Sequence, residues 1–367
     1  MNVQIDVIQA NGQGVGDFAR QIVTEGCVDA GLYKPFMNPQ TGRSFITIYK
    51  SGDPNDEASY ENVPITTNAL LRQDEWKTLD EVVLKTAESR LGGVQDLKSK
   101  GLTYNIGNGM GTTVFQYQDV DGDLTAGLSM DGIVRGQSNR VDFGTHSLPL
   151  PICHVDYEMN DRVLQVSRKL GQSLDTSMAE RASRAVALKL EEMLFTNTTY
   201  AYGSGTIYSY VNAPDRNQIT MTEVWDAAGK TGLEILTEVI SLKAASIAAH
   251  HYGPWVLYIP VGYETKMDYD FSDVKGDGTI RERLLKVNNI SEVKVIDTLP
   301  EDNVLLVEMT SDVVRWINGM GVQNVQWTKE AGLIHNFKVM TIQVPQVRAD
   351  KSNQSGLVHC APAEYLD

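Results

Sequence analysis

The sequence predicts a mixed α+β protein, parts of which cannot bury their own apolar surface. Three observations lead to this expectation. Residues 1–62 are rich in Gly, Asn and Pro, residues 114–150 form short extended runs broken by glycines, and a helical segment at 177–195 precedes alternating helical and extended patterns. Because the first two segments lack a core of their own, we expect them to pack against other copies of the chain. The pattern therefore indicates a subunit of an assembly.

Composition places the chain among ordinary globular proteins. Of its 367 residues, 42% are hydrophobic and 22% are charged, which is enough to form at least one large core. No run approaches the roughly 18 apolar residues that cross a bilayer. The first residues lack the basic start and apolar core of a signal peptide. We therefore expect a soluble, intracellular protein with no membrane partner.

Charge and cysteine content argue against a tight nucleic-acid binder, a disulfide-rich protein and a structural zinc protein. The formal net charge is −15, whereas tight binding of nucleic acid depends on Lys and Arg that neutralise phosphates. A wall around DNA is compatible with this charge, because such a wall should be weakly repelled by its contents. Cys27, Cys153 and Cys360 are far apart, so we expect reduced thiols and neither a disulfide framework nor a zinc site.

The start of the chain is expected to form an extended arm followed by a helix. Within residues 1–62 a single β-like run stands out, at 45–49. Apolar residues then recur at helical spacing between Trp76 and Ala87. The pair Gly92 and Gly93 is expected to end this helix.

The middle of the chain is predicted to leave the core and return to it. Residues 114–150 indicate a long hairpin-like excursion, because short extended runs alternate with turn-forming glycines. Helices are expected at 160–170 and at 177–195, the second about 28 Å long at 1.5 Å per residue. Ser177 and Glu180 have the spacing of a capping box for the second helix. Its apolar stripe comprises Met178, Ala182, Val186, Leu190 and Leu194, broadened by Ala185 and Met193.

The second half of the chain indicates an α/β arrangement. Residues 350–367 are expected to be a tail, and Pro345 predicts that the last strand ends at a sheet edge. The expected elements are a helix near 233–250 and strands at 255–259, 292–296, 303–309 and 336–347.

Two segments superficially resemble ligand-binding loops. Residues 107–111 are glycine-rich like a phosphate-binding loop, but they lack the preceding apolar strand and the Lys-Ser/Thr pair, so we interpret them as a turn. Three aspartates between Asp119 and Asp123 have the spacing of calcium ligands. Leu124 and Met130 stand where an EF-hand needs Gly and Glu, which leaves adventitious cation binding or a solvated turn.

Catalytic motifs are absent from the sequence. Asp268, Asp270 and Asp273 have no nearby His or Cys, and the adjacent His250 and His251 would point about 100° apart on a helix. No GxSxG, HExxH or paired Cys/His arrangement occurs. We therefore predict no catalytic residue, no cofactor and no metal, and a site assembled from distant residues stays an alternative.

Short motifs follow one another in a specific order between about residues 110 and 350. They are LPLPICH at 148–154, RVL at 162–164, SR at 167–168, LDT at 174–176, EEMLF at 191–195, GTIY at 205–208, DRN at 215–217, HYGPWVLY at 251–258, TIR at 279–281, MTSDVVR at 309–315 and NFKVM at 336–340. In this order they resemble major capsid proteins of tailed bacteriophages, which have the Hong Kong 97-type fold and are related to encapsulins.

The resemblance implies an α+β chain divided as this capsid family is divided. The implied parts are an N-terminal arm at 1–62, an extended loop at 113–150, a peripheral domain at 63–112, 151–203 (with the spine helix) and 320–350 (return strands), an axial domain at 204–319, and a C-terminal tail at 351–367.

The resemblance also implies a structural function and not an enzymatic one. The chain would assemble through pentamers and hexamers into an icosahedral head around the double-stranded DNA of a tailed phage, without sequence-specific DNA binding. Implied partners are other copies, separate scaffolding and portal proteins, and decoration proteins where the shell carries them. The implied location is the virion, after assembly in the host cytoplasm. Two alternatives stay open, an encapsulin-type compartment, which the arm-like start disfavours, and a soluble enzyme with an unrecognised site.

Two details of the extended loop bear on assembly. Some family members join subunits covalently through a lysine in this loop, but residues 113–150 contain no lysine, so we expect a non-covalent shell. Arg135 and Arg140 are the candidate contacts with acidic patches of a neighbouring copy, against the alternative of two solvated charges. No charged helical scaffolding segment opens the sequence, so scaffolding is expected from a separate protein.

Overall fold

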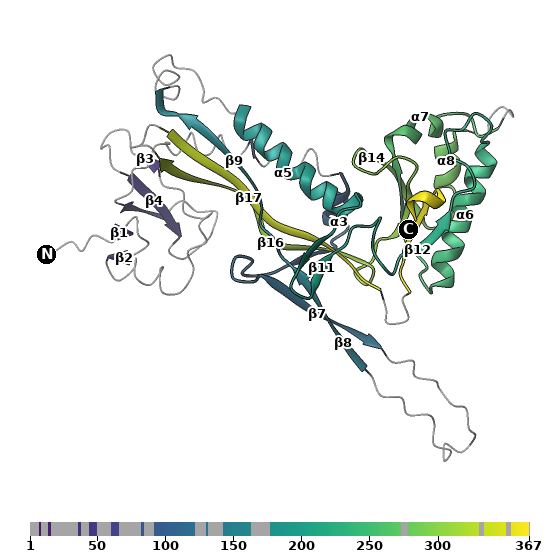
Figure 1. Cartoon of the computed structure of the whole chain (residues 1–367), viewed down its shortest axis with the longest axis horizontal. Coiled ribbons are helices and arrows are strands. Elements are labelled where there is room, and N and C mark those ends of the chain that lie inside the picture. The colour runs from purple at the N-terminus through teal and green to yellow at the C-terminus, as the bar shows by residue number, and fades with distance from the viewer. Residues whose placement is uncertain are drawn as a thin grey trace. The chain divides into compact units, whose positions relative to one another are not determined.

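Runs of strands separated by single helices or short groups of helices follow one another along the chain in the computed structural model (Figure 1). The structure describes residues 92–121, 142–162, 177–272, 278–329, 334–349 and 354–366, with Met130 and the short segments 7–8, 14–15, 36–37, 44–49, 60–65 and 82–83. Two compact units divide the chain. The first holds Met1–Arg90, Ile152–Ala187 and Met320–Thr341, and the second holds Leu91–Pro151, Leu188–Gly319 and Ile342–Asp367.

The first unit is built on two long strands. β9 (Cys153–Asn160) pairs antiparallel with β17 (Ile334–Val347), and the pairing ends at Thr341, before Pro345. Tyr157 and Phe337 are partners across this pair, and their rings stack with centroids 5.1 Å apart. The core of this unit comprises Phe36, Val83, Tyr157, Ala179, Ala182, Val186, Phe337 and Val339.

The segment expected to form an arm contains more strand structure than the sequence suggested. The predicted run at 45–49 is confirmed as β4 (Ser44–Tyr49). It pairs with β3 (Phe36–Met37) and with β5 (Tyr60–Ile65), so a three-stranded antiparallel sheet forms. The expectation of one isolated run was wrong, because the polar residues and proline of β5 hide its pairing with β4. A further pair is β1 (Val7–Ile8) with β2 (Gly14–Val15).

A five-stranded sheet forms the centre of the second unit. Its order is β12-β18-β15-β13-β14, in which β15 (Val304–Glu308) runs antiparallel to both neighbours and the two outer pairs are parallel. All six residues of β13 (Trp255–Pro260) are buried, as expected of an inner strand with an uninterrupted apolar run. The predicted strands at 255–259, 292–296 and 303–309 are confirmed. The edges are β12 (Asn217–Thr220) and β14 (Ile290–Ile296).

Helix α6 (Gly232–Ala248) packs against this sheet and confirms the helix predicted near 233–250. Ile235, Val239 and Leu242 recur at spacings of four and three and are fully buried in the core. Thr231 and Glu234 form a capping box at its start. Shorter elements follow: η2 (Val261–Tyr263), α7 (Glu264–Met267) and α8 (Ile280–Leu285).

The C-terminal segment is an inner strand, so the expected tail at 350–367 was wrong for its described residues. β18 (Leu357–Ala361) is completely buried between β12 and β15, and a turn of 3-10 helix, η4 (Ala363–Tyr365), follows it. A five-residue run between polar residues gives little local signal. Its burial depends on strands that lie far away in the sequence.

The glycine pair at 92–93 lies in the first turn of a helix, and the end of the helix expected before it lies outside the described residues. α3 spans Gly92–Ser99, and of the preceding predicted helix only residues 82–83, which are helical, are described. A Cβ atom on Gly93 would lie 2.3 Å from Cε2 of Phe195. Glycine is therefore present at this position for close packing, and its helix-breaking tendency is overridden.

The long helix is confirmed with the predicted bounds, as α5 (Ser177–Phe195). Four stripe residues, from Ala182 to Leu194, are buried, but Met178 is 42% exposed. Ala185 is also exposed, and the stripe widens on its other side through Ala179, Ser183, Ala187 and Glu191. Of the helix expected at 160–170, Asn160 ends β9 and the two following residues are helical, while the remainder lies outside the described residues.

The predicted hairpin-like excursion is confirmed at its base. β7 (Val114–Asp121) pairs antiparallel with β8 (Asp142–Pro149), from Val114↔Pro149 to Asp121↔Asp142. Next to it, β10 (Tyr200–Tyr202) and β11 (Gly205–Ile207) form a short hairpin that packs against β8. β6 (Thr103–Asn105) leads into β7 and pairs in parallel with β16 (Val314–Lys329).

Candidate functional site

A row of aromatic rings covers one face of the β7–β8 hairpin at its base. Phe115 and Tyr117 are two residues apart on β7, so they share a face of the strand. Ring centroids lie 5.4 Å apart for Tyr104 and Phe115, 6.4 Å for Phe115 and Tyr117, and 5.3 Å for Tyr117 and His146. The guanidinium carbon of Arg348 lies 5.8 Å from the Tyr117 centroid. The hairpin therefore begins from a surface of half-exposed rings.

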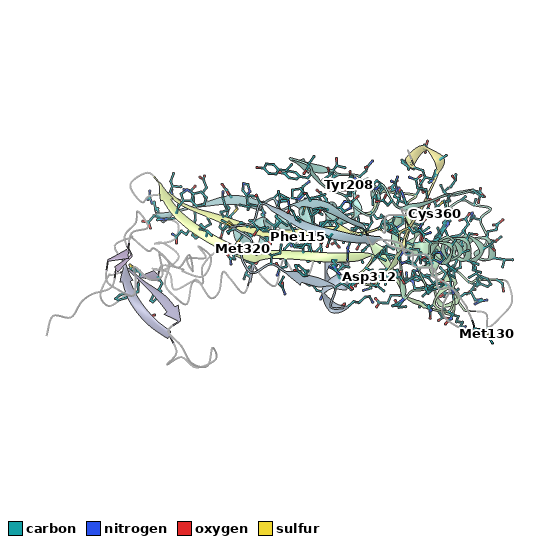
Figure 2. The ribbon with its side chains drawn as sticks, turned by 90° about the horizontal axis from the view of Figure 1, so that it is seen from below. Phe115, Met130, Tyr208, Asp312, Met320 and Cys360 are labelled. Atoms are coloured by element: carbon teal, nitrogen blue, oxygen red, sulfur yellow. The ribbon has the colours of Figure 1, made fainter. Side chains whose placement is uncertain are left out.

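A cavity of about 500 Å³ opens beside Tyr117. Three segments of the second unit line it: the hairpin base, the β10–β11 hairpin with the loop after it, and the end of β17 (Figure 2 marks Phe115 and Tyr208). Its polar groups suit hydrogen bonding to a peptide segment. They are Thr145, His146, Ser147, Ser204, Thr206, Tyr208, Asp215 and Arg348.

Close backbone packing holds the hairpin base in place. A Cβ atom on Gly205 would lie 2.5 Å from the carbonyl oxygen of Ser147, so β11 approaches β8 more closely than any other residue would allow. The predicted turn at 107–111 is confirmed and has a similar role. Gly109 lies against the backbone of Gly319, and the Asn108 side chain accepts a 2.9 Å bond from the Gly111 amide.

The buried carboxylate of Glu191 holds the start of α3, the helix that precedes β6 and the hairpin. Glu191 on α5 accepts hydrogen bonds from the backbone amides of Gly93 (2.6 Å) and Val94 (3.3 Å), at the unpaired start of α3. Burial raises the pKa of Glu191 to about 7, and the charges of Asp96 and Asp297 add to the effect. The sequence signal for this residue was a charged position within the apolar stripe of α5.

A second set of polar groups, of which Asp96 is buried, ties α3 to the sheet. Asp96 is 3% exposed and accepts a 3.1 Å hydrogen bond from the Tyr258 hydroxyl on β13. Lys294 on β14 pairs with Asp96 and with Glu292, and Lys100 pairs with Glu292 at 2.7 Å. Hydrogen bonds and ion pairs therefore join α3 to β13 and β14. These contacts were not predicted from the sequence.

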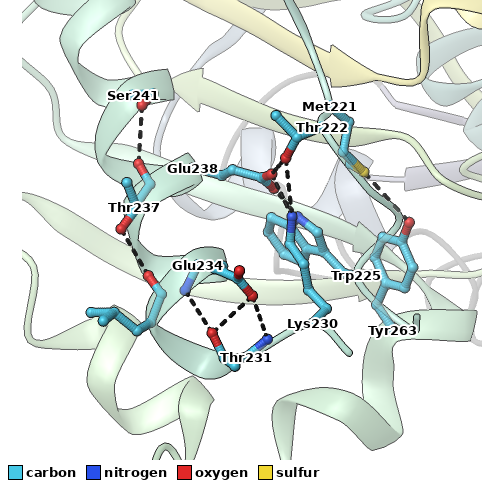
Figure 3. A network of polar contacts seen from close by, with 11 residues as sticks. Met221, Thr222, Trp225, Lys230, Thr231, Glu234, Thr237, Glu238, Ser241 and Tyr263 are labelled. Carbon is cyan, nitrogen blue, oxygen red and sulfur yellow. Dashed lines mark hydrogen bonds and ion pairs between the residues drawn. The ribbon is translucent and has the colours of Figure 1, made fainter. Parts of the chain in front are cut away.

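Other buried charges have structural partners. Glu238 on α6 accepts hydrogen bonds from Thr222 (2.6 Å) and the Trp225 indole (2.7 Å), and it pairs with the buried Lys230 (Figure 3). His251 pairs with the buried Glu308, which also accepts a 2.8 Å bond from the Gly253 amide. These contacts give each of these charged groups a partner inside the second unit.

The structure describes only some of the residues that the sequence suggested as contacts or ligands. Arg135 and Arg140 lie outside the described residues. Asp119 and Asp121 belong to β7, whereas Asp123 lies outside the described part. Oδ1 of Asp268 lies 3.6 Å from Nε of Arg281, so this carboxylate forms an ion pair. Across the described ranges, no group of three His, Cys, Asp or Glu side chains could hold a metal ion, and no helix is long and apolar enough to span a membrane.

Together the projecting hairpin, the long helix and the five-stranded sheet define the fold of capsid shell proteins, which confirms the expected fold. A virus-like particle from Pyrococcus furiosus matches with a TM-score of 0.56 and 16% identity, over 78% of this chain and 98% of that one. The capsid of Myoviridae phage XM1 matches with a TM-score of 0.56 and 11% identity, over 74% of this chain and 92% of that one. The capsid of a native GTA particle matches with a TM-score of 0.53 and 11% identity, over 85% of this chain and 95% of that one.

Family membership follows from the sequence match. Residues 65–360 match a family of unknown function, DUF6260, and the chain belongs to this family. No curated protein matches the chain.

Proposed function

We propose that this protein is the structural subunit of an icosahedral capsid that encloses the double-stranded DNA genome of a tailed phage. The observation that carries the proposal is how completely the fold is shared. The three shell chains are covered over 98%, 92% and 95% of their lengths, so the likeness extends well beyond one domain. Two of the three are named as capsids.

The divisions expected from the sequence complete this proposal. Residues 1–62 would lie as an arm, and 113–150 as an extended loop, across neighbouring copies. The ring-lined base of the β7–β8 hairpin and its cavity supply a polar and aromatic surface for a peptide of a neighbour. Arg135 and Arg140 would contact acidic patches of another copy. We propose no catalytic role.

Partners and location follow from the same proposal. Copies would close into pentamers and hexamers, aided by separate scaffolding and portal proteins, and decoration proteins would bind where the shell carries them. The protein would be assembled in the host cytoplasm and be found in the virion. The net charge of −15 supports an inner wall that does not bind its DNA tightly.

A compartment shell loaded with protein cargo is the second candidate. The likeness to the virus-like particle of Pyrococcus furiosus favours it. Nuclease-resistant DNA inside purified native particles would support the phage head, whereas particles that contain an enzyme and no DNA would support the compartment. Neighbouring portal and terminase genes, or a cargo gene, separate the two in the same way.

Electron microscopy of the purified recombinant protein, with light scattering on the same sample, tests the proposal. We expect closed shells, rings or tubes of hundreds of kilodaltons or more. Capsid subunits can wait for a scaffold, so a small species must be tested again with the neighbouring scaffold and portal genes co-expressed. A monomer or dimer under both conditions would overturn the proposal.

A further inference from the structure

The outer face of α6 carries an unusual row of exposed apolar side chains. Leu233, Ile240 and Ile247 are 62%, 48% and 40% exposed. They are seven residues apart, so they lie on one side of the helix, with a drift of about 20° per step. Ala244 and Ala248 are exposed on the same side. The described part of the second unit leaves this row uncovered.

The polar side chains on this face are hydrogen-bonded within the helix. The hydroxyl of Thr237 donates to the Leu233 carbonyl (2.8 Å), and that of Ser241 donates to the Thr237 carbonyl (3.0 Å; Figure 3). The carboxylate of Glu234 accepts from the amide and the hydroxyl of Thr231, both at 2.8 Å. A partner could therefore cover the face without leaving a hydroxyl unsatisfied.

The face is also nearly free of charge. Lys243 is directed away from it, since its ammonium donates to the Asn288 carbonyl (2.8 Å) and lies 5.3 Å from the Trp255 ring centroid. Glu234, held in the capping box, is the one charged side chain among the exposed residues of α6. In a chain with a net charge of −15, such a surface is where two copies can approach at least electrostatic cost.

We propose that this face, Leu233, Ile240 and Ile247 with Ala244 and Ala248, packs against a second copy of the chain when the shell forms. The inference rests on the proposed function and identifies one contact within it. A ring of more than two copies requires heterologous contacts, so the row meets a different surface of the neighbour.

The size of the face decides what kind of contact this is. At 1.5 Å per residue, 17 residues span about 25 Å, and a strip roughly 10 Å wide covers on the order of 250 Å². A stable pairwise interface buries about 800 Å² per partner. The α6 face alone is therefore too small to hold a dimer. It contributes where several contacts close a ring together.

The test compares Ile240→Lys with Ile240→Val in the full chain, and Glu223→Lys is a charge control at an exposed site outside the helix. All three are expected to fold, with melting temperatures within about 2 °C of the wild type. Ile240→Lys should yield at least tenfold fewer closed particles by light scattering and microscopy. The other two should assemble like the wild type. Normal assembly of a folded Ile240→Lys would overturn the inference.

A chemical measurement covers the case in which Ile240→Lys fails to fold. Ile240→Cys is labelled with a maleimide as dissociated subunit and as assembled particle, and its peptide is quantified by mass spectrometry. We expect labelling at least tenfold slower in particles. Equal rates would overturn the inference while assembly itself stands. Protection from labelling that requires a second, co-expressed protein would assign the face to that protein and overturn the inference. A wild type that never assembles would overturn the proposed function and this contact together.

Discussion

The carboxylate of Glu191 accepts a 2.6 Å hydrogen bond from the backbone amide of Gly93, and this joins the end of α5 to the start of α3. A carboxylate at a helix N-terminus is favourable, because it meets unpaired amides and the positive end of the helix dipole. Burial opposes its ionisation and raises the pKa of Glu191 to about 7. The contact therefore carries a dependence on pH.

Glu191→Gln should remove this dependence. Between pH 4.5 and 7 the folded chain holds a proton that the unfolded chain has lost, so the contribution of Glu191 to stability falls as pH rises. The full change corresponds to about 3 kcal/mol. We expect Glu191→Gln to match the wild type at about pH 4, below the unfolded pKa, and to exceed its free energy of unfolding by about 1–3 kcal/mol at pH 8. Urea unfolding at four pH values measures the difference.

Glu192→Gln is the control for this prediction. Glu192 follows Glu191 directly on α5, is half-buried and pairs with Lys189 at 3.0 Å. Its free energy of unfolding should follow the wild type across the pH range. If the curve of Glu191→Gln also stays parallel to the wild type, the buried carboxylate does not titrate as stated.

Gly93→Ala should destabilise the second unit. The added Cβ would lie 2.3 Å and 2.5 Å from two ring carbons of Phe195, so the ring or the start of α3 must shift. Overpacking of this kind costs about 2 kcal/mol. Gly107→Ala is the matched control, because its Cβ would meet nothing within 4 Å. A loss of stability no greater than that of the control would mean that α3 tolerates the methyl group.

Glu238→Ala should destabilise the sheet and its covering helix. The change leaves the ammonium of Lys230, whose side chain is 3% exposed, and the indole of Trp225 without the carboxylate that both contact. Removal of one partner of a buried ion pair costs about 3 kcal/mol. Chemical denaturation measures it, with the exposed Glu223→Ala expected within about 0.5 kcal/mol of the wild type. A loss below about 1 kcal/mol would contradict this reading.

Mature particles should release single subunits when boiled in denaturing detergent. Residues 113–150 contain no lysine, so the extended loop lacks the amine that a lysine cross-link would use. Denaturing electrophoresis should show one band near the chain mass of 40.5 kDa. Ladders of high mass that persist after boiling would show that the subunits are joined covalently by other residues.

Arg135→Glu with Arg140→Glu should lower the yield of particles. Reversal of both charges in a chain of net charge −15 converts the proposed attraction to acidic patches into repulsion. The control, Lys286→Glu with Lys189→Glu, makes the same change of charge at the exposed C-cap of α8 and at an exposed position of α5. Equal yields from both double variants would show that the two arginines are solvated charges.

The sequence by itself determined the elements whose signal is local. The stripe from Ala182 to Leu194 fixed α5, because apolar residues at helical spacing need one buried side. The apolar run at 255–259 fixed β13, and the glycine-broken extended runs fixed the hairpin. The ordered motifs between about 110 and 350 added the expected fold, through their resemblance to capsid proteins of tailed phages.

Only the tertiary structure decided the rest, because the deciding contacts join residues far apart in the chain. β18 is buried by β12 and β15, so its five residues gave no sign of an inner strand. Position 93, in the first turn of α3, is occupied by glycine because Phe195 leaves no room for a side chain there. Glu191 and Lys230 carry charged side chains of a kind that is ordinarily exposed. They are stable in the interior because distant amides and a distant carboxylate satisfy them.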